Sequence, residues 1–233
     1  MNRFRLLVTR KISPSLVLRA GLNGIDVLEK EFIAIEPVTS GELARKIEKI
    51  ISTKAVVVFT SRNAVKATGA NYDVKDVDWK IYCLESATAK EVMKYFGEGK
   101  IAGTAANAEG LSKVIIQNAD SRKIVFFCGN LRRDLLPATL RSNGFEVNEI
   151  VVYSTVLHPQ TIVDDYDAVA FFSPSAVESF FSANKTGEGV VFFSVGKTTR
   201  DAIRKYTANK IFTSKKPSEE SLFELANEVK SNF

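Results

Sequence analysis

The chain has 233 residues, of which 45% are hydrophobic and 25% are charged, and its formal net charge is +5. This length suits one large domain or two domains of about a hundred residues each. No apolar run approaches the roughly 20 residues of a membrane span, and the apolar stretch that ends at Arg10 is typical of a buried strand rather than a secretory signal. We therefore expect a cytoplasmic protein without a membrane segment. Its Lys and Arg residues suit an acidic partner, but they are scattered, so nucleic acid is not the expected one.

Two cysteines and one histidine leave little basis for metal chemistry. Cys83 and Cys128 lie far apart without a CxxC spacing, and we expect both to be buried free thiols. His158 is the only histidine, and no other ligands cluster around it at the spacing of a zinc site. A Ser-His-Asp mechanism would depend on that one residue, so it is not expected either.

Apolar runs and helical periodicity alternate along the whole chain. Runs rich in Val, Ile and Phe predict strands near residues 4–9, 26–35, 55–60, 80–84, 100–103, 123–128, 145–153, 167–172, 190–195 and 210–213. Helical spacing predicts helices near residues 14–21, 40–51, 62–69, 86–96, 108–117, 133–142, 174–183, 197–206 and 218–230. Continuously apolar strands are buried on both faces, as in a parallel sheet. The alternation therefore predicts an α/β fold with doubly wound parallel sheets.

An internal repeat organises these elements in an unusual order. Segments of the middle region recur in the same order towards the C-terminus: residues 57–65 with 169–177, 84–88 with 195–199, and 106–111 with 217–222. The last segment of the middle region, residues 124–128 and 143–147, finds its counterpart at the N-terminus instead, in residues 4–8 and 23–27. The matches are weak singly, but their consistent circular order indicates a duplication.

The circular order predicts two domains, one of them split. The continuous domain covers residues 38–150, and the split domain covers residues 1–34 plus 156–233. The chain crosses between them at linkers 35–37 and 151–155, which both resemble strands, so we expect a paired two-stranded β linker. Such a hinge predicts relative domain motion and a ligand site in the cleft beside it.

Small hydroxyl residues begin helices directly after strands in both halves. In open parallel sheets, ligands bind at the carboxyl ends of the strands, where helix N-termini offer free N–H groups and partial positive charge to anions. Each terminus contributes only about 0.3–1 kcal/mol when it is exposed, so several together are needed to hold a highly charged ligand. The candidate substrate-binding residues are Thr60, Ser61, Asn63, Ser86, Thr88, Ser173, Ser175, Gly196, Lys197, Thr198 and Thr199.

A structural interpretation of these helix starts stays open beside the functional one. Ser and Thr are ordinary N-cap residues, and Pro174 suits a first helical turn. A duplication copies structure as well as function, so the repetition does not decide between the two. Residues 195–198 do not form a phosphate-binding loop, because a Walker A motif needs a glycine at the position of Val191, inside a predicted strand.

Tyr153 is the candidate catalytic residue. It lies on the second crossing strand, so its phenol could reach the cleft as a proton donor. A tyrosine packed at the hinge with its hydroxyl satisfied explains the same residue equally well.

Short motifs occur along nearly the whole chain in a distinctive order. They are residues 7–10 (Leu-Val-Thr-Arg), 59–65, 152–155, 172–177, 196–199 and the helix start at Pro217. In order, spacing and split layout they resemble the uroporphyrinogen-III synthase family. The resemblance implies two domains with the active site between them, hydroxymethylbilane with its eight carboxylates as substrate, and neither metal nor cofactor.

The resemblance also implies a reaction. In a cyclising lyase of heme biosynthesis, the terminal hydroxyl of the substrate would leave as water. Attack on the far pyrrole would then give a spiro intermediate, and the macrocycle would close with ring D inverted. Tyr153 would donate a proton to the leaving hydroxyl, and the helix starts would bind carboxylates. An electron-rich pyrrole expels the hydroxyl itself, so the protein need only assist its departure and select the ring conformation.

Departures from the family pattern leave a second hypothesis open. Lys11, Glu85 and Arg200 stand where the family usually has proline, glycine and alanine. They allow a divergent or inactive relative. The second hypothesis is a non-catalytic module that uses the same hinge to sense a tetrapyrrole or another anion. A third hypothesis, a binding protein of the periplasmic type, is disfavoured because no signal peptide is recognised. We expect a monomer, since no exposed apolar stripe is predicted.

Overall fold

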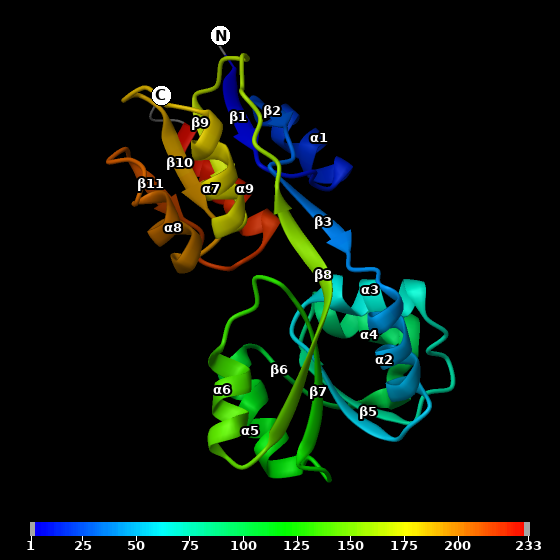
Figure 1. Cartoon of the computed structure of the whole chain (residues 1–233). Coiled ribbons are helices and arrows are strands. Elements are labelled where there is room, and N and C mark those ends of the chain that lie inside the picture. The colour runs from blue at the N-terminus through cyan, green and yellow to red at the C-terminus, as the bar shows by residue number, and fades with distance from the viewer. Residues whose placement is uncertain (1–2, 231–233) are drawn as a thin grey trace. The chain divides into compact units, whose positions relative to one another are not determined.

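The structure, a computed structural model, describes residues 3–230 (Figure 1). The chain divides into two compact units, Met1–Ala34 with Val156–Phe233 and Ile35–Thr155. We call them the split unit and the continuous unit, and describe each by itself. Both contain a largely parallel sheet between helices, so the predicted α/β fold class is confirmed.

The split unit contains a five-stranded sheet in the order β11-β10-β9-β1-β2, and its neighbouring strands all pair in parallel. The strands are β1 (Phe4–Val8), β2 (Ile25–Glu29), β9 (Ala168–Phe171), β10 (Val191–Ser194) and β11 (Ile211–Thr213). The helices are α1 (Pro14–Leu22), α7 (Pro174–Ala183), α8 (Lys197–Ile203) and α9 (Glu219–Val229). Successive side chains of a strand point to opposite faces, so β1 contributes to two cores. Leu6 packs with α1 and α9, while Leu7 packs with α7 and α8.

The second sheet has six strands in the order β3-β8-β7-β4-β5-β6. Its edge strand β3 leads into the continuous unit, which contains the other five strands. The strands are β3 (Ile33–Pro37), β4 (Ala55–Phe59), β5 (Trp79–Leu84), β6 (Ile101–Ala105), β7 (Lys123–Gly129) and β8 (Glu146–Leu157). The helices are α2 (Gly41–Ile51), α3 (Arg62–Asn71), α4 (Ala87–Phe96), α5 (Ala108–Asn118) and α6 (Leu135–Ser142), with a 3-10 turn η1 (Glu98–Lys100). One core lies between the sheet and α2, α3 and α4, and the other between the sheet and α5 and α6.

The two sheets have equivalent strand orders, but a different strand of that order comes first in the sequence. The order β11-β10-β9-β1-β2 corresponds strand for strand to β6-β5-β4-β7-β8. The repeated sequence segments occupy matching places, since β9 corresponds to β4 and β1 to β7. The split unit is therefore a circular permutation of the continuous unit.

The strands that cross between the units pair with each other, since β3 and β8 are hydrogen-bonded neighbours. Val38 N donates to Val152 O at 3.0 Å, and His158 N donates to Phe32 O at 2.9 Å. The single strand expected at 26–35 is wrong: β2 and β3 are separate. β2 pairs with β1 and β3 pairs with β8, and between β2 and β3 the fully buried Phe32 ring packs edge-on against Phe180, with centroids 5.3 Å apart.

The helix expected at 197–206 is also shorter than predicted, because α8 ends at Ile203. The next turn tightens, with Lys205 N bonded to Ala202 O and Tyr206 N bonded to Ile203 O. This brings the Tyr206 ring parallel to Phe181, with centroids 4.8 Å apart.

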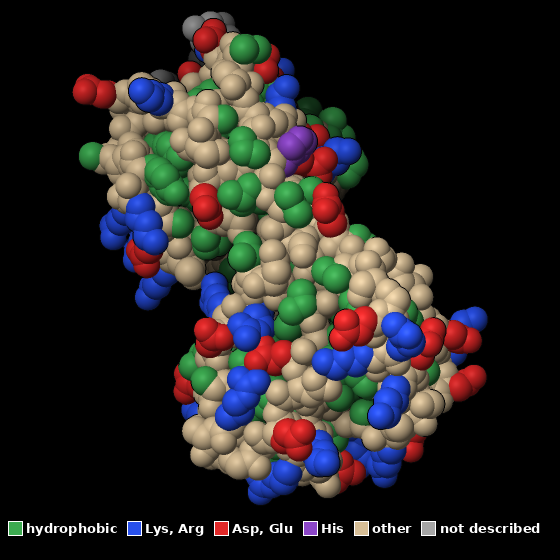
Figure 2. All heavy atoms as spheres, viewed as in Figure 1, with side chains coloured by type: hydrophobic (Ala, Val, Ile, Leu, Met, Phe, Trp, Pro, Cys, Tyr) green, Lys and Arg blue, Asp and Glu red, His purple; other side chains and the backbone are tan. Residues whose placement is uncertain are grey.

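Cys83 and Cys128 are free and buried, as predicted, and burial raises the pKa of both thiols to about 11. Within residues 3–230, no helix combines the length and the apolar character needed to cross a membrane. On the face shown in Figure 2, basic and acidic side chains lie interspersed.

Candidate functional site

Tyr153 lies at the carboxyl edge of the sheet in the continuous unit. Its hydroxyl donates a hydrogen bond to Ser61 Oγ at 3.0 Å, and both side chains are half-buried. Ser61 follows β4 and begins α3, so the contact joins β8 to a helix start. The structure thus brings together two of the predicted site residues, which lie 92 positions apart in the sequence.

An irregularity in strand pairing directs the Tyr153 side chain. Cys128 pairs with Val151, but Gly129 pairs with Tyr153, so β8 carries one extra residue at this point. Such bulges bend a strand and redirect its side chains, and they are often found beside functional sites.

Gly129 leaves the space that the phenol ring occupies. A Cβ atom placed on this glycine would lie 2.4 Å from Tyr153 Cζ and 2.7 Å from its hydroxyl oxygen. A larger residue at position 129 would therefore displace the ring.

Asn130 fixes the backbone of β8 around Tyr153. Its N–H donates to Tyr153 O at 3.2 Å. Its side chain accepts from Thr155 N at 2.8 Å and donates to Thr155 O at 3.4 Å. Gly129 and Asn130 were not predicted as site residues. A glycine that ends a buried strand is the signal that could have pointed to them.

The other predicted residues of the continuous unit lie at the same edge, because parallel strands end there together. Ser61 Oγ accepts from Asn63 N at 3.1 Å and thereby caps α3. Ser86 precedes α4 with a φ of 62°, the only positive φ among the described residues other than glycine. Such a conformation costs about 1–3 kcal/mol and is found preferentially at functional sites. Thr88 is buried, at 6% exposure, whereas Thr60 is half-buried.

The carboxyl edge of the split unit carries the remaining predicted residues. Ser173 caps α7, accepting from Ala176 N at 3.2 Å. The short helix α8 begins after Gly196, where the side chains of Lys197 and Thr198 are exposed and that of Thr199 is buried. Ser175 is half-buried in the first turn of α7. These residues therefore have a structural role at the N-termini of their helices. Binding of a ligand by them stays a prediction.

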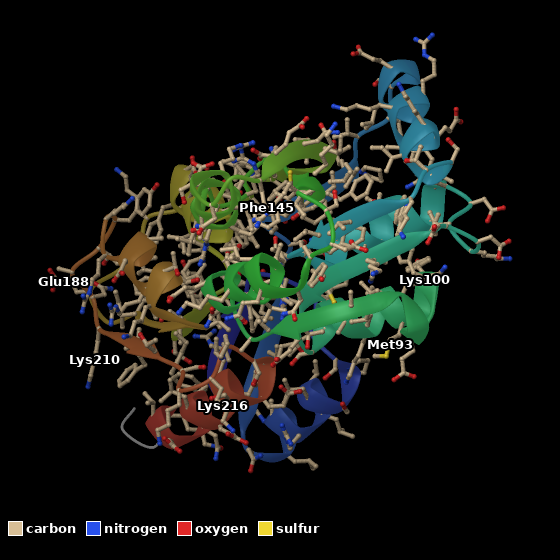
Figure 3. The ribbon with its side chains drawn as sticks, turned by 90° about the horizontal axis from the view of Figure 1, so that it is seen from below. Met93, Lys100, Phe145, Glu188, Lys210 and Lys216 are labelled. Atoms are coloured by element: carbon tan, nitrogen blue, oxygen red, sulfur yellow. The ribbon has the colours of Figure 1, made fainter. Side chains whose placement is uncertain are left out.

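Arg10, a charged residue of this edge, was not predicted as a site residue. It follows β1, and its guanidinium lies over the Phe172 ring, 4.3 Å from Cζ to the centroid. Its Nη2 pairs with Glu219 Oε1 at 2.5 Å. Lys216, labelled in Figure 3, lies in the turn just before α9, where its carbonyl accepts from Ser218 N. At the carboxyl edge of this unit Arg10 is thus paired with Glu219, the first residue of α9.

The continuous unit also has a pocket at its carboxyl edge, with a volume of about 350 Å³. Apolar side chains make up much of its lining, which also includes Asn107, the residue that caps α5 by accepting from Gly110 N at 2.9 Å. The lining residues are Thr60, Leu84, Ala106, Asn107, Ala108, Phe126, Arg133 and Leu136. A pocket lined by apolar side chains and an arginine suits a carboxylate on a hydrophobic ring.

The part of the chain that the structure describes contains no group of three or more His, Cys, Asp or Glu that could hold a metal ion.

Comparison with known proteins identifies the family of this chain. A family model described as uroporphyrinogen-III synthase HemD matches residues 16–224. The chain belongs to the uroporphyrinogen-III synthase family. A similar curated protein is the uroporphyrinogen-III synthase of Saccharomyces cerevisiae, which is 25% identical. That match covers 62% of this chain and 62% of the yeast protein, less than two thirds of its length.

Two solved structures of uroporphyrinogen-III synthases share the fold. The Helicobacter pylori protein superposes with a TM-score of 0.71 at 19% identity, over 97% of this chain and 99% of that one. A mutant of the Thermus thermophilus protein gives 0.67 at 16% identity, over 98% of both chains.

The positions at which this synthase family member departs from the family pattern are accommodated locally. Lys11 Nζ lies 3.9 Å from Glu31 Oε2, and Glu85 is exposed. Arg200 donates from Nε and Nη2 to Asp201 Oδ1, at 3.0 and 2.9 Å. Helices α1 and α4 still form after Lys11 and Glu85, and Arg200 lies within α8.

Proposed function

We propose that this chain is a uroporphyrinogen-III synthase, which converts hydroxymethylbilane into uroporphyrinogen III with inversion of ring D and loss of water. The observation that carries the proposal is the family match over residues 16–224. The hydroxyl of Tyr153 at the carboxyl edge of a sheet supplies a group suited to the first chemical step.

In that step Tyr153 acts as a general acid. Its proton passes to the terminal hydroxyl of the substrate while the carbon–oxygen bond breaks, and the electron pair leaves with water. The pyrrole nitrogen stabilises the cation that remains, and the electron-rich far pyrrole then attacks this cation to form the spiro intermediate. Because the substrate provides most of the driving force, a single weak acid in the right place is sufficient.

The carboxylates of the substrate are bound by the helix starts of both units. Thr60, Asn63, Ser86 and Thr88 belong to the continuous unit, whose Ser61, also predicted to bind a carboxylate, is hydrogen-bonded to Tyr153 instead. Ser173, Ser175, Gly196, Lys197, Thr198 and Thr199 belong to the split unit. The 350 Å³ pocket beside α5 supports this role, since its apolar lining with Arg133 suits a carboxylate carried on a hydrophobic ring.

The activity is tested with a coupled assay that supplies hydroxymethylbilane and separates the product isomers. We expect uroporphyrinogen III in excess over the type I isomer, which forms spontaneously. Type I product alone would contradict the proposal and favour a non-catalytic module that binds a tetrapyrrole or another anion.

Tyr153→Phe tests the general acid. We expect the single-turnover rate to fall about 100-fold without being abolished, at the low end of general acid catalysis, because the pyrrole itself expels the hydroxyl. Tyr95→Phe is the matched control: this tyrosine lies near the end of α4 and packs against Gly69. A Tyr153→Phe variant as fast as the wild type would remove Tyr153 from the mechanism.

We further propose that the enzyme acts as a cytoplasmic monomer and does not bind nucleic acid. Light scattering at twice the chain mass of 25.7 kDa would contradict the monomer.

A further inference from the structure

We propose that Ser61 is a positioning residue for Tyr153 and stabilises its phenolate during the reaction, rather than binding a substrate carboxylate. This inference rests on the proposed function, since it assigns Ser61 to the proton-transfer step of that reaction.

The hydrogen bonds of Ser61 carry the inference. A serine hydroxyl has one donor hydrogen and two acceptor lone pairs. Ser61 Oγ accepts from Asn63 N at 3.1 Å and from Tyr153 Oη at 3.0 Å. Both acceptor positions are therefore in use. The bond from Asn63 N also holds the oxygen in place, because that N–H belongs to the first turn of α3.

The Ser61 hydrogen can serve the phenol once Tyr153 has lost its own. In the resting arrangement the phenol donates to Ser61. When the phenol proton passes to the leaving hydroxyl, the negative charge left on Tyr153 Oη needs a new donor. Rotation of the Ser61 hydroxyl directs its hydrogen to that oxygen, which stays at hydrogen-bond distance. No atom is lost in this exchange: one proton leaves with water, and Ser61 keeps its own.

The surroundings of Tyr153 prevent the ring from swinging away during the transfer. The ring lies directly against the Gly129 backbone on one side. Asn130 holds the β8 backbone through Tyr153 O and both backbone groups of Thr155. The hydroxyl therefore has a fixed position, in which Ser61 supplies the partner.

The two roles of Ser61 predict different kinetics. A carboxylate ligand contributes to binding the substrate, so its loss raises KM. A residue that stabilises the phenolate acts only as the proton moves, so its loss lowers kcat with KM unchanged. Its effect must also disappear when Tyr153 has no hydroxyl.

The experiment compares Ser61→Ala and Ser61→Thr, each alone and combined with Tyr153→Phe, in the full chain with hydroxymethylbilane. Ser40→Ala is the matched control, since Ser40 caps α2 by accepting from Leu43 N at 3.1 Å and has no bond to a tyrosine. Thermal melting of every variant separates loss of a helix cap from loss of catalysis.

We expect Ser61→Ala to lower kcat about tenfold at unchanged KM, and Ser61→Thr to restore most of the rate because it keeps both the cap and the hydroxyl. We expect Ser61→Ala with Tyr153→Phe to be no slower than Tyr153→Phe alone, and Ser40→Ala to keep the wild-type rate. If Ser61→Ala is too unstable to assay, Ser61→Gly with and without Tyr153→Phe gives the same comparison, because glycine also lacks the hydroxyl and is a better N-cap than alanine.

Three results would overturn the inference. They are a rise in KM at unchanged kcat, an equal loss of rate in the Tyr153→Phe background, or an active Ser61→Ala enzyme at the wild-type rate. Wild-type protein that forms only the type I isomer would overturn the proposed function, and the inference with it. The isomer ratio of the wild type therefore distinguishes the two failures.

Discussion

Gly129 is the position at which one added methyl group would most disturb Tyr153. Its φ lies outside the positive range, so the backbone accepts alanine there. The added Cβ, however, would lie 2.4 Å from Tyr153 Cζ. The ring and not the backbone must therefore move.

We predict that Gly129→Ala lowers the single-turnover rate about as much as Tyr153→Phe, roughly 100-fold, because the displaced hydroxyl no longer reaches the leaving group. Circular dichroism should show an intact fold. The control is Gly99→Ala, where no atom lies within 4 Å of the new Cβ. A folded Gly129→Ala enzyme with the wild-type rate would contradict the packing of Tyr153 described above.

At the scale of elements, an ion cluster joins the segment after β7 to β8 and α6. Glu149 on β8 pairs with Arg132, which lies in that segment, and with Arg141 of α6, whose Nη2 is 2.7 Å from Glu149 Oε1. Arg132 also pairs with Asp134 at 2.7 Å. The Glu149 side chain is only 15% exposed, so this cluster is screened less than a surface pair.

Opposing effects determine the pKa of Glu149. Burial raises the pKa, but the hydrogen bonds and charges of Arg141 and Arg132 outweigh burial and lower the pKa below its ordinary value. A carboxylate with a lowered pKa in the folded state stabilises the fold above its unfolded pKa, and this contribution is lost as the pH falls through the folded pKa.

We predict that Glu149→Gln lowers the free energy of unfolding by about 1–3 kcal/mol at pH 7, because two arginines lose a charged partner. The difference from the wild type should shrink as the pH falls below the ordinary pKa of a glutamate, about 4.3, and through the lower folded pKa, where the wild-type carboxylate becomes protonated too. Urea unfolding at several pH values measures this. A difference that stays constant from pH 7 to pH 3 would show that the charge of Glu149 is not its source.

At the scale of the whole molecule, the circular permutation places the first strand of the chain in the middle of a sheet. In the split unit β1 lies between β9 and β2, and Leu6, Leu7 and Val8 are fully buried. The continuous unit has both of its cores within residues 47–152.

We predict that residues 35–155 alone unfold cooperatively, whereas residues 156–233 alone do not fold, because they lack β1 and β2. A chain in which residues 156–230 precede residues 3–34 through a flexible linker should fold, since it has the strand order of the continuous unit. Thermal melts followed by circular dichroism test the three chains. Cooperative unfolding of residues 156–233 by themselves would contradict the division into two units.

The sequence alone determined the α/β class, most of the helices and strands, and the circular order of the repeat. These features depend on residues close together in the chain. The apolar runs ending at Phe59 and Phe171 indicate buried strands, and Ser61 and Ser173 cap helices through N–H groups two or three residues further on. Periodicity and capping are local, so they can be recognised without knowing what packs against them.

Only the tertiary structure decided which side chains of these elements lie together and which are accessible to a ligand. The bond of Tyr153 to Ser61 spans 92 positions, and the pair of Arg10 with Glu219 spans 209. The extra residue that turns Tyr153 towards Ser61 depends on the register between β7 and β8. Burial of Thr88 and Thr199 depends likewise on how α4 and α8 pack on their sheets. Register and packing arise between segments that are distant in the sequence, and a one-residue change in register moves a side chain to the other face of its sheet, so no local pattern could specify them.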